Sequence, residues 1–380
     1  MKEELPFADA EFEARLAKVR ASMAQRGLDT LVVTSPENIY YLSAFHTAAY
    51  DLLQALVVPI AGEPTLVNII HESEYLVPFR AWTHQRVAYS VRQPFVDVLG
   101  ELLMQQGSRR IGVEKSAFFL TVRDYEALAA RIPNASLLDG SGVIDQFRAI
   151  KSAAEIAHIR SACRVVEAGM RAGVEACAAG RLDTDVAAEV HSALIRAGGD
   201  YMSYPPFINV GWTSSLVHNT WCGKRLEPGE LVFLEISGVV RRYGAALMRS
   251  VAIGPLDTEF ERRNGIVHEV LAATMAAIRP GVTSGEVNAI CAATFQKQGY
   301  RMLKRAGYSM GINFPPGWSE GDILDLSLDN PTVLQPGMVF HIPQPYRMPG
   351  EQTVSISETV LVTDSGCESL TQFPRELFRR

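Results

Sequence analysis

The sequence predicts two domains, an α/β domain over residues 1–150 and an α+β domain over residues 151–380. A chain of 380 residues is too long for one ordinary hydrophobic core. Helix and strand patterns alternate over the first 150 residues, as is typical of an α/β fold. Beyond residue 151, two pairs of helices are each followed by strands, which indicates a weak internal repeat. Two such halves facing each other would enclose a central cleft.

In the N-terminal domain the spacing of apolar residues predicts each element in turn. Phe12–Gln25 has helical spacing, and Thr30–Thr34 (TLVVT) has the composition of a buried strand. Two apolar runs flank the Gly62-Glu63-Pro64 turn, which predicts a β-hairpin. The remaining predictions are strands at 55–60, 65–70, 110–114 and 136–138, and a helix at 122–131.

The C-terminal domain is expected to begin with an amphipathic helix from Ser152 to about Ala179, which Gly180 ends. Thr283 and Glu286 form a capping box that marks the start of a later helix. The segment Val232–Val251 alternates and turns as a β-hairpin. Further helices are predicted at 185–197, 260–279 and 284–297.

Composition excludes several classes of protein. The net charge of −6 and the lack of a basic run argue against a nucleic-acid-binding surface. No apolar stretch is long enough to span a bilayer, and the first residues do not resemble a signal peptide. The five cysteines are scattered, with no CxxC pair, so reduced thiols are expected. We therefore expect a cytoplasmic protein that binds neither membranes nor nucleic acids.

Candidate functional residues fall in five segments of the C-terminal domain. On the predicted hairpin, positions 235 and 246 are expected to lie opposite each other on one face. The other segments are 214–219 (SSLVHN), 307–311 (GYSMG), 335–342 (QPGMVFHI) and 356–363 (ISETVLVT).

These segments resemble the motifs of the creatinase/prolidase/methionine-aminopeptidase family, the peptidase M24-like enzymes with a pita-bread fold. The resemblance implies a creatinase-like N-terminal domain, a pita-bread catalytic domain and a homodimer. It also places the five metal-ligand positions of the family, which are two Asp, a His and two Glu, on Glu235, Ala246, Tyr308, Pro343 and Ser357. Ala and Pro offer no donor side chain, whereas a dinuclear metal site needs several converging ligands. The replacements therefore predict that no metal cofactor is bound.

The replacements themselves are similar to the ectoine hydrolase branch of this family. The similarity rests on residues 203–206 (SYPP), on LEISG at 234–238, on GYSMGI with PPGW at 315–318, and on ISE at 356–358. It implies a metal-independent hydrolase of a C–N bond in a small amidine-, guanidino- or amide-type substrate, with ectoine-like ring opening favoured. A creatinase-like amidinohydrolase is an alternative, although the catalytic glutamate of the creatinase hairpin would fall on Met248. An Xaa-Pro aminopeptidase-like metallopeptidase with an altered site and an inactive binding scaffold also remain open.

The resemblance gives His218 the role of acid/base, because a histidine lies there in the metal-free creatinases, and His341 is the second choice. Glu235 is expected to hold an amidinium, or to act as nucleophile or base. Tyr308 is expected to donate to the tetrahedral intermediate or to anchor a substrate carboxylate. Four further residues are predicted to bind the substrate: Glu358, Ser357, Trp318 and Phe207.

Overall fold

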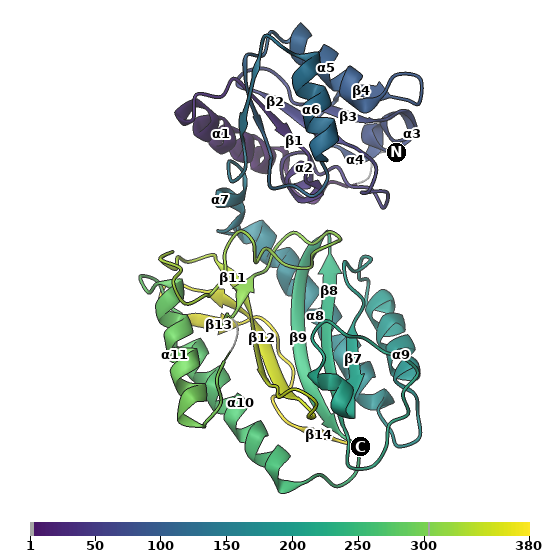
Figure 1. The fold of residues 1–380 in the computed structure, drawn as a ribbon, viewed down its shortest axis with the longest axis vertical. Coiled ribbons are helices and arrows are strands. Elements are labelled where there is room, and N and C mark those ends of the chain that lie inside the picture. The colour runs from purple at the N-terminus through teal and green to yellow at the C-terminus, as the bar shows by residue number, and fades with distance from the viewer. Residues whose placement is uncertain (1–3, 303–304) are drawn as a thin grey trace. The chain divides into compact units, whose positions relative to one another are not determined.

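The chain folds into two compact units (Figure 1). The structure is a computed structural model, and it describes residues 4–302 and 305–380. The N-terminal unit extends to Arg148, and the C-terminal unit runs from Ala149 to Arg380. No helix in the described part of the chain is long and apolar enough to cross a membrane.

The N-terminal unit is built on a six-stranded mixed sheet with the order β4-β3-β2-β1-β5-β6. β1 lies at its centre, parallel to β5 and antiparallel to β2, and all four of its residues are buried. The strands are β1 (Thr30–Val33), β2 (Ala55–Pro59), β3 (Thr65–Ile69), β4 (Gln85–Tyr89), β5 (Arg110–Val113) and β6 (Ser136–Asp139). The helices are α1 (Asp9–Gln25), α2 (Pro36–Ser43), α3 (Ile70–Tyr75), α4 (Val77–Arg80), α5 (Phe95–Gln105), α6 (Val122–Arg131) and α7 (Asp145–Arg148). The unit is the predicted α/β domain.

The C-terminal unit consists of two similar halves. In each half two helices precede antiparallel strands, which confirms the predicted repeat. The first half has α8 (Ala153–Ala176), α9 (Asp183–Arg196), β7 (Phe207–Val210), a short 3-10 helix (Gly211–Ser215), β8 (Leu231–Val240) and β9 (Tyr243–Ala252). The second half has α10 (Thr258–Ala277), α11 (Ser284–Lys297), β10 (Tyr308–Ser309), β11 (Val339–Tyr346), β12 (Val354–Val362) and β13 (Cys367–Ser369). The C-terminal strand β14 (Phe378–Arg379) returns to the sheet of the first half, where it pairs in parallel with β9.

Helices cover the strands of each half (Figure 1). α8 packs against β8 and β9, and α10 packs against β11 and β12. The approach of α8 depends on Gly238 of β8. A Cβ atom at this position would lie 2.7 Å from the backbone of Ala162 and of Val166. Any other residue type would push the helix away. The absence of a side chain at Gly238 therefore allows α8 to pack closely against the hairpin.

The turn of the β8–β9 hairpin sets a register that differs from the predicted one. Arg241 and Arg242 both have positive φ values, 49° and 61°, as in a type I′ turn. This two-residue turn pairs Glu235 with Met248 and Ser237 with Ala246. The prediction that positions 235 and 246 lie on one face holds, but the prediction that they lie directly opposite is wrong. Sequence alternation determines the face, whereas the turn geometry determines the pairing.

Hydroxyl side chains of β12 join the two sheets. Thr359 Oγ1 accepts a hydrogen bond from the Ala246 N–H at 3.0 Å and donates one to the Ala246 carbonyl at 2.8 Å. Ser357 Oγ accepts from the Met248 N–H at 2.6 Å. These bonds satisfy backbone groups of β9 that face the second sheet. As a result the strands that carry Glu235, His341 and Ser357 are fixed to one another through β9.

Candidate active site

Glu235 is a nearly buried carboxylate among aromatic side chains. Its strand, β8, is buried along almost its whole length, and Glu235 itself is 8% exposed. It pairs with Phe207 of β7 and with Met248 of β9. Phe207, Phe233, Met248 and Trp318 pack together as a small cluster, which we call the aromatic cluster. A carboxylate in such surroundings is poorly solvated, so it favours a cationic ligand.

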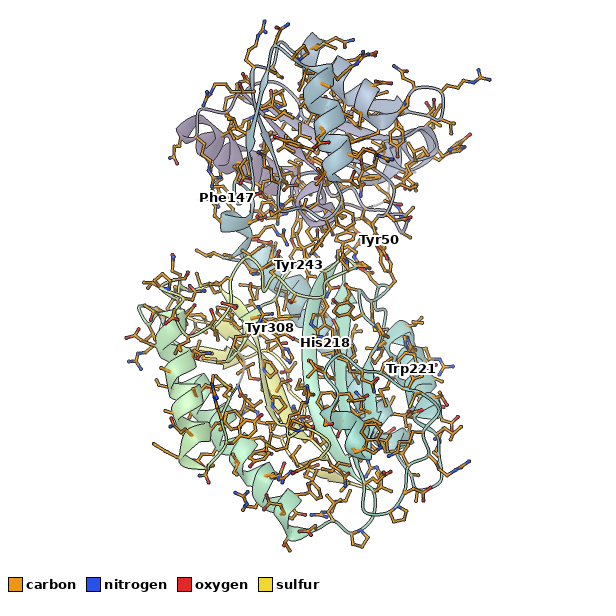
Figure 2. All side chains as sticks on the ribbon, viewed as in Figure 1. Tyr50, Phe147, His218, Trp221, Tyr243 and Tyr308 are labelled. Carbon is orange, nitrogen blue, oxygen red and sulfur yellow. The ribbon has the colours of Figure 1, made fainter. Side chains whose placement is uncertain are left out.

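A row of five rings brings most of the predicted site residues together. The ring centroids of His218 and Phe207 lie 6.1 Å apart, and those of Phe207 and Trp318 lie 5.4 Å apart. The row continues from Trp318 to His341 at 6.5 Å and from His341 to Tyr308 at 5.2 Å. Figure 2 labels its two ends, Tyr308 beside the strands of the second half and His218 beside those of the first half. The first and second halves therefore both contribute to the site.

Tyr308, His341 and Ser357 form a hydrogen-bonded chain. His341 Nδ1 lies 2.7 Å from the Tyr308 hydroxyl, and His341 Nε2 lies 2.7 Å from Ser357 Oγ. His341 is fully buried, so both ring nitrogens are occupied by neighbouring hydroxyls instead of water. Ser357, which was predicted to bind substrate, is also fully buried and contacts His341. In this arrangement His341, which is itself held by Ser357, orients the Tyr308 hydroxyl.

The surroundings of Tyr308 keep its hydroxyl protonated. Burial raises the pKa of Tyr308 well above its usual value, and the negative charge of Glu235 raises it further. A hydrogen bond from Trp318 opposes the rise. Tyr308 is therefore a neutral hydrogen-bond donor whose pKa responds to the charge of Glu235.

A buried ion pair holds the loop that carries Tyr308 and Trp318. Lys151 Nζ lies 2.7 Å from a carboxylate oxygen of Glu320 and donates to Ser309 Oγ at 2.9 Å. Glu320 also accepts from the Ile312 N–H at 3.1 Å. Both charged side chains are only 1% exposed. These contacts fix the chain directly after Tyr308 and on both sides of Trp318, so the two rings are held in place before a ligand binds.

His218 lies at the exposed end of the row. It is solvent-exposed, and it has a φ of 58°, which is uncommon for a residue other than glycine. Its ring faces Phe207, which separates it from Trp318 and His341 in the row. An exposed imidazole exchanges protons with water directly. Of the two predicted histidines, His218 has the better access for proton transfer, whereas His341 is placed to orient Tyr308.

The substrate-binding role predicted for Glu358 is wrong. On β12 it pairs with Ile342 and points away from the face that carries Ser357 and His341. Its carboxylate is completely buried and lies 2.8 Å from an Arg249 guanidinium nitrogen and 2.9 Å from Arg375 Nε. Because side chains alternate along the strand, only one of Ser357 and Glu358 can lie on the face that carries His341. The ion pair with Arg249 shows that Glu358 lies on the other face. Glu358 stabilises the fold behind the site.

The residues at the five metal-ligand positions of the family do not fit a metal pair. Ala246 and Pro343 have no donor atom in their side chains. Ser357 Oγ already contacts the Met248 N–H and His341, and the Tyr308 hydroxyl contacts His341 as well. Within residues 4–302 and 305–380, no three His, Cys, Asp or Glu side chains are grouped so that they could hold a metal ion. Glu235 is the single carboxylate at these positions.

Sequence reasoning missed Arg347. This residue follows directly after β11, and its guanidinium carbon lies 5.1 Å from the centre of the Phe233 ring. Counting alternate residues from His341 along the strand, through positions 343 and 345, would have placed Arg347 on the same face.

Comparison with known proteins places this fold and site in one family. Residues 157–364 match the model of metallopeptidase family M24, and residues 15–150 match the creatinase/prolidase N-terminal domain. The chain belongs to metallopeptidase family M24, and it is a hydrolase that acts on C–N bonds. The predicted pita-bread architecture of the C-terminal domain is thereby confirmed.

Individual relatives match over almost the whole chain. An ectoine hydrolase of Halomonas elongata is 30% identical, with 98% of each chain covered. An Xaa-Pro dipeptidase of Pyrococcus furiosus is 26% identical, with 96% of this chain and 99% of that protein covered. The solved prolidase of Pyrococcus horikoshii superposes with a TM-score of 0.84 at 23% identity, covering 96% of this chain and 99% of that chain. At that identity the likeness to the prolidase concerns the fold alone.

Proposed function

We propose that this protein hydrolyses a C–N bond of a small amidine and does so without a metal ion, with ectoine-like ring opening as the favoured reaction. The observation that carries the proposal is Glu235, a nearly buried carboxylate that pairs with Phe207 and Met248 of the aromatic cluster and whose charge raises the pKa of Tyr308. An amidinium is a planar cation, and carboxylates and aromatic faces are its preferred partners. The likeness to an ectoine hydrolase along nearly the whole chain supports this choice.

The chemistry follows from the charges of the substrate and the site. A protonated amidine carbon is electrophilic, so water can add to it once a base removes a proton. The ring C–N bond then breaks, its electron pair stays on the nitrogen, and an acid supplies that nitrogen with a proton. The products are an amide and an amine. His218 is the exposed group that can exchange protons, while Glu235 stabilises the cation and Tyr308 donates to the tetrahedral intermediate.

Direct attack by Glu235 on the amidine carbon is a second route. The carboxylate would add to the amidinium carbon, and the ring C–N bond would break as its electron pair and a proton from an acid go to the leaving nitrogen. Water would then cleave the anhydride-like bond to Glu235, giving the amide and restoring the carboxylate. Acid quenching during turnover, followed by mass spectrometry of the peptide that contains Glu235, distinguishes the two routes. An increase by the mass of the substrate indicates covalent attack. An unmodified peptide at every time point indicates attack by water.

Replacing Tyr308 by phenylalanine is expected to lower kcat by about 10- to 100-fold with a smaller change in KM, because a donor to the intermediate acts mainly in the transition state. Because the Tyr308 pKa is raised, its hydroxyl stays a donor to higher pH than a free tyrosine. Deprotonation of Tyr308 should therefore not lower wild-type activity below about pH 10. The kinetics of the two proteins across pH check both points. An unchanged kcat in Tyr308→Phe would contradict the proposed role.

Removal of metal ions is expected to leave the activity unchanged. The test is hydrolysis of a panel by protein treated with a strong chelator, with and without added Mn²⁺, Co²⁺ or Zn²⁺. The panel contains ectoine, hydroxyectoine, a guanidino acid, a ureide and an Xaa-Pro dipeptide. We expect turnover of the cyclic amidines at the same rate under all conditions.

The same panel tests the alternatives. Metal-dependent cleavage of the dipeptide would instead support an Xaa-Pro-specific metallopeptidase, as the likeness to an Xaa-Pro dipeptidase suggests. Turnover of the guanidino acid alone would support a creatinase-like amidinohydrolase. No turnover of any member would support a binding scaffold. Homodimerism stays a prediction, which light scattering of the purified protein would test.

A further inference from the structure

Arg347 brings a positive charge to the aromatic cluster. Its guanidinium carbon lies 5.1 Å from the centre of the Phe233 ring, and Phe233 packs with Phe207, Met248 and Trp318. Phe233 and Glu235 are two residues apart on β8, so their side chains share one face of the strand. Arg347 therefore lies on the same side of the sheet as the carboxylate.

The guanidinium of Arg347 has unused hydrogen-bonding capacity. Its Nε is buried and has no hydrogen-bond partner among the described residues. Burial lowers the pKa of Arg347, and the charge of Glu235 opposes this fall. The backbone of Arg347 is held from both sides, because its N–H donates to the Tyr300 hydroxyl and its carbonyl accepts from it, at 3.3 and 3.1 Å. A buried guanidinium N–H group without a hydrogen-bond partner costs free energy unless a ligand accepts its hydrogen bond.

Two other arginines near the site differ from Arg347 because their charges are matched by protein groups. Arg249 is completely buried, but its guanidinium binds Glu358 and four backbone carbonyls at 2.7–2.9 Å. Arg305 lies over the Tyr308 ring and pairs with Asp325 at 3.3 Å. The contrast marks Arg347 as the arginine whose guanidinium is available to a ligand.

We propose that Arg347 binds a carboxylate of the substrate, so that the preferred substrate is a zwitterion whose amidinium faces Glu235 and whose carboxylate faces Arg347. This inference rests on the proposed function and specifies its substrate class. The planar fork of a guanidinium matches the two oxygens of a carboxylate. Glu235 and Arg347 together carry no net charge, which suits a ligand that is itself neutral overall. A phosphate dianion would be repelled by Glu235.

Calorimetric binding of two ligands tests the inference. All proteins in the titration also carry His218→Ala, so that the proposed acid/base does not hydrolyse the ligands, and wild type means here the protein with no other substitution. One ligand is ectoine, a cyclic amidine that carries a carboxylate, and the other is the same ring without the carboxylate. Wild-type protein is expected to bind ectoine at least about 30-fold more tightly, because a fork of charge-assisted hydrogen bonds is lost with the carboxylate. Arg347→Met should remove this preference by weakening only the binding of ectoine. Arg347→Lys, which keeps the charge but loses the fork, should give an intermediate preference.

Arg263→Met is the matched control. Arg263 also lies over an aromatic ring, that of Tyr346 at 5.0 Å, but it pairs with Glu259 and Glu351. This variant should bind both ligands as the wild type does. An equal loss for both ligands in Arg347→Met would overturn the inference, because it would show a packing role alone. Wild-type protein that binds neither ligand would also overturn it.

Turnover, measured separately on the same proteins with His218 restored, tests the proposed function. Wild-type protein that binds ectoine through Arg347 but does not hydrolyse it would refute the proposed function and leave the role of Arg347 intact. Hydrolysis of both rings with equal kcat/KM would support an amidine hydrolase and refute recognition of the carboxylate.

Discussion

Glu235→Gln is expected to lower kcat/KM for amidine hydrolysis by about three orders of magnitude, because a carboxylate that acts as base or nucleophile contributes on the order of 10²–10⁴ in rate. Glutamine has nearly the same shape but no charge, so it neither attracts an amidinium nor attacks its carbon. Glu235 is 8% exposed within the aromatic cluster, where the loss of a charge does not require repacking. Steady-state kinetics on ectoine and a thermal melt of each protein provide the measurement.

Glu368→Gln provides a control of the same chemistry. Glu368 is a surface carboxylate on β13 that pairs with Arg160, with both side chains 42% exposed. This control should keep wild-type kinetics. A Glu235→Gln protein that melts normally and keeps more than about a tenth of the activity would remove Glu235 from the mechanism, because general-base catalysis alone contributes at least about 100-fold. A loss of activity together with a much lower melting temperature would point to a structural role.

The helices were predictable because their signals are local. The helix α11 (Ser284–Lys297) begins at the capping box of Thr283 and Glu286, and both reciprocal hydrogen bonds are present. The helix α8 begins at Ser152, which is likewise part of a capping box with Glu155. Such motifs lie within four consecutive residues, so a single sequence is enough to recognise them.

The pairing of strands was less predictable because it depends on turn geometry. Two consecutive arginines in the left-handed region form the β8–β9 turn, and arginine gives no sequence signal for that conformation. If the turn is shifted by one residue, every residue of one strand pairs with a different residue of the other strand. For this reason the sequence placed position 246 on the correct face but opposite the wrong residue.

The candidate site depends on contacts between segments that are distant in sequence. Phe207 and Trp318 are in contact although they come from different halves of the domain, and periodicity within either segment does not predict this contact. Family motifs brought His218, Glu235 and Tyr308 together as candidates, since the motifs preserve positions in a fold. Motifs did not indicate Arg347, because only its place at the end of β11 and its contact with Phe233 connect it to the site.

Glu358→Ala is expected to lower the free energy of unfolding by about 3–5 kcal/mol, because it leaves the guanidinium of Arg249 buried without its carboxylate. Both side chains are fully buried, and Glu358 also accepts hydrogen bonds from Ser369 and Thr371. The double variant Arg249→Met with Glu358→Met should recover part of the loss, since no unpaired charge then remains. Urea unfolding of the three proteins, followed by tryptophan fluorescence, measures these differences.

The exposed ion pair of Arg160 and Glu368 serves as a control that shows how much of the stability loss in Glu358→Ala comes from burial of the charges. Its two contacts of 2.8 Å are as short as the contact between Arg249 and Glu358, but both partners are well exposed to solvent. Glu368→Ala should therefore lower the free energy of unfolding by at most about 1 kcal/mol.

Below its unfolding temperature, Glu358→Ala should keep the KM of the wild type, because Glu358 faces away from His341 and Ser357. A raised KM in a protein of unchanged stability would show that Glu358 does bind the substrate. Lower stability with a normal KM would show that Glu358 stabilises the strands that carry the site.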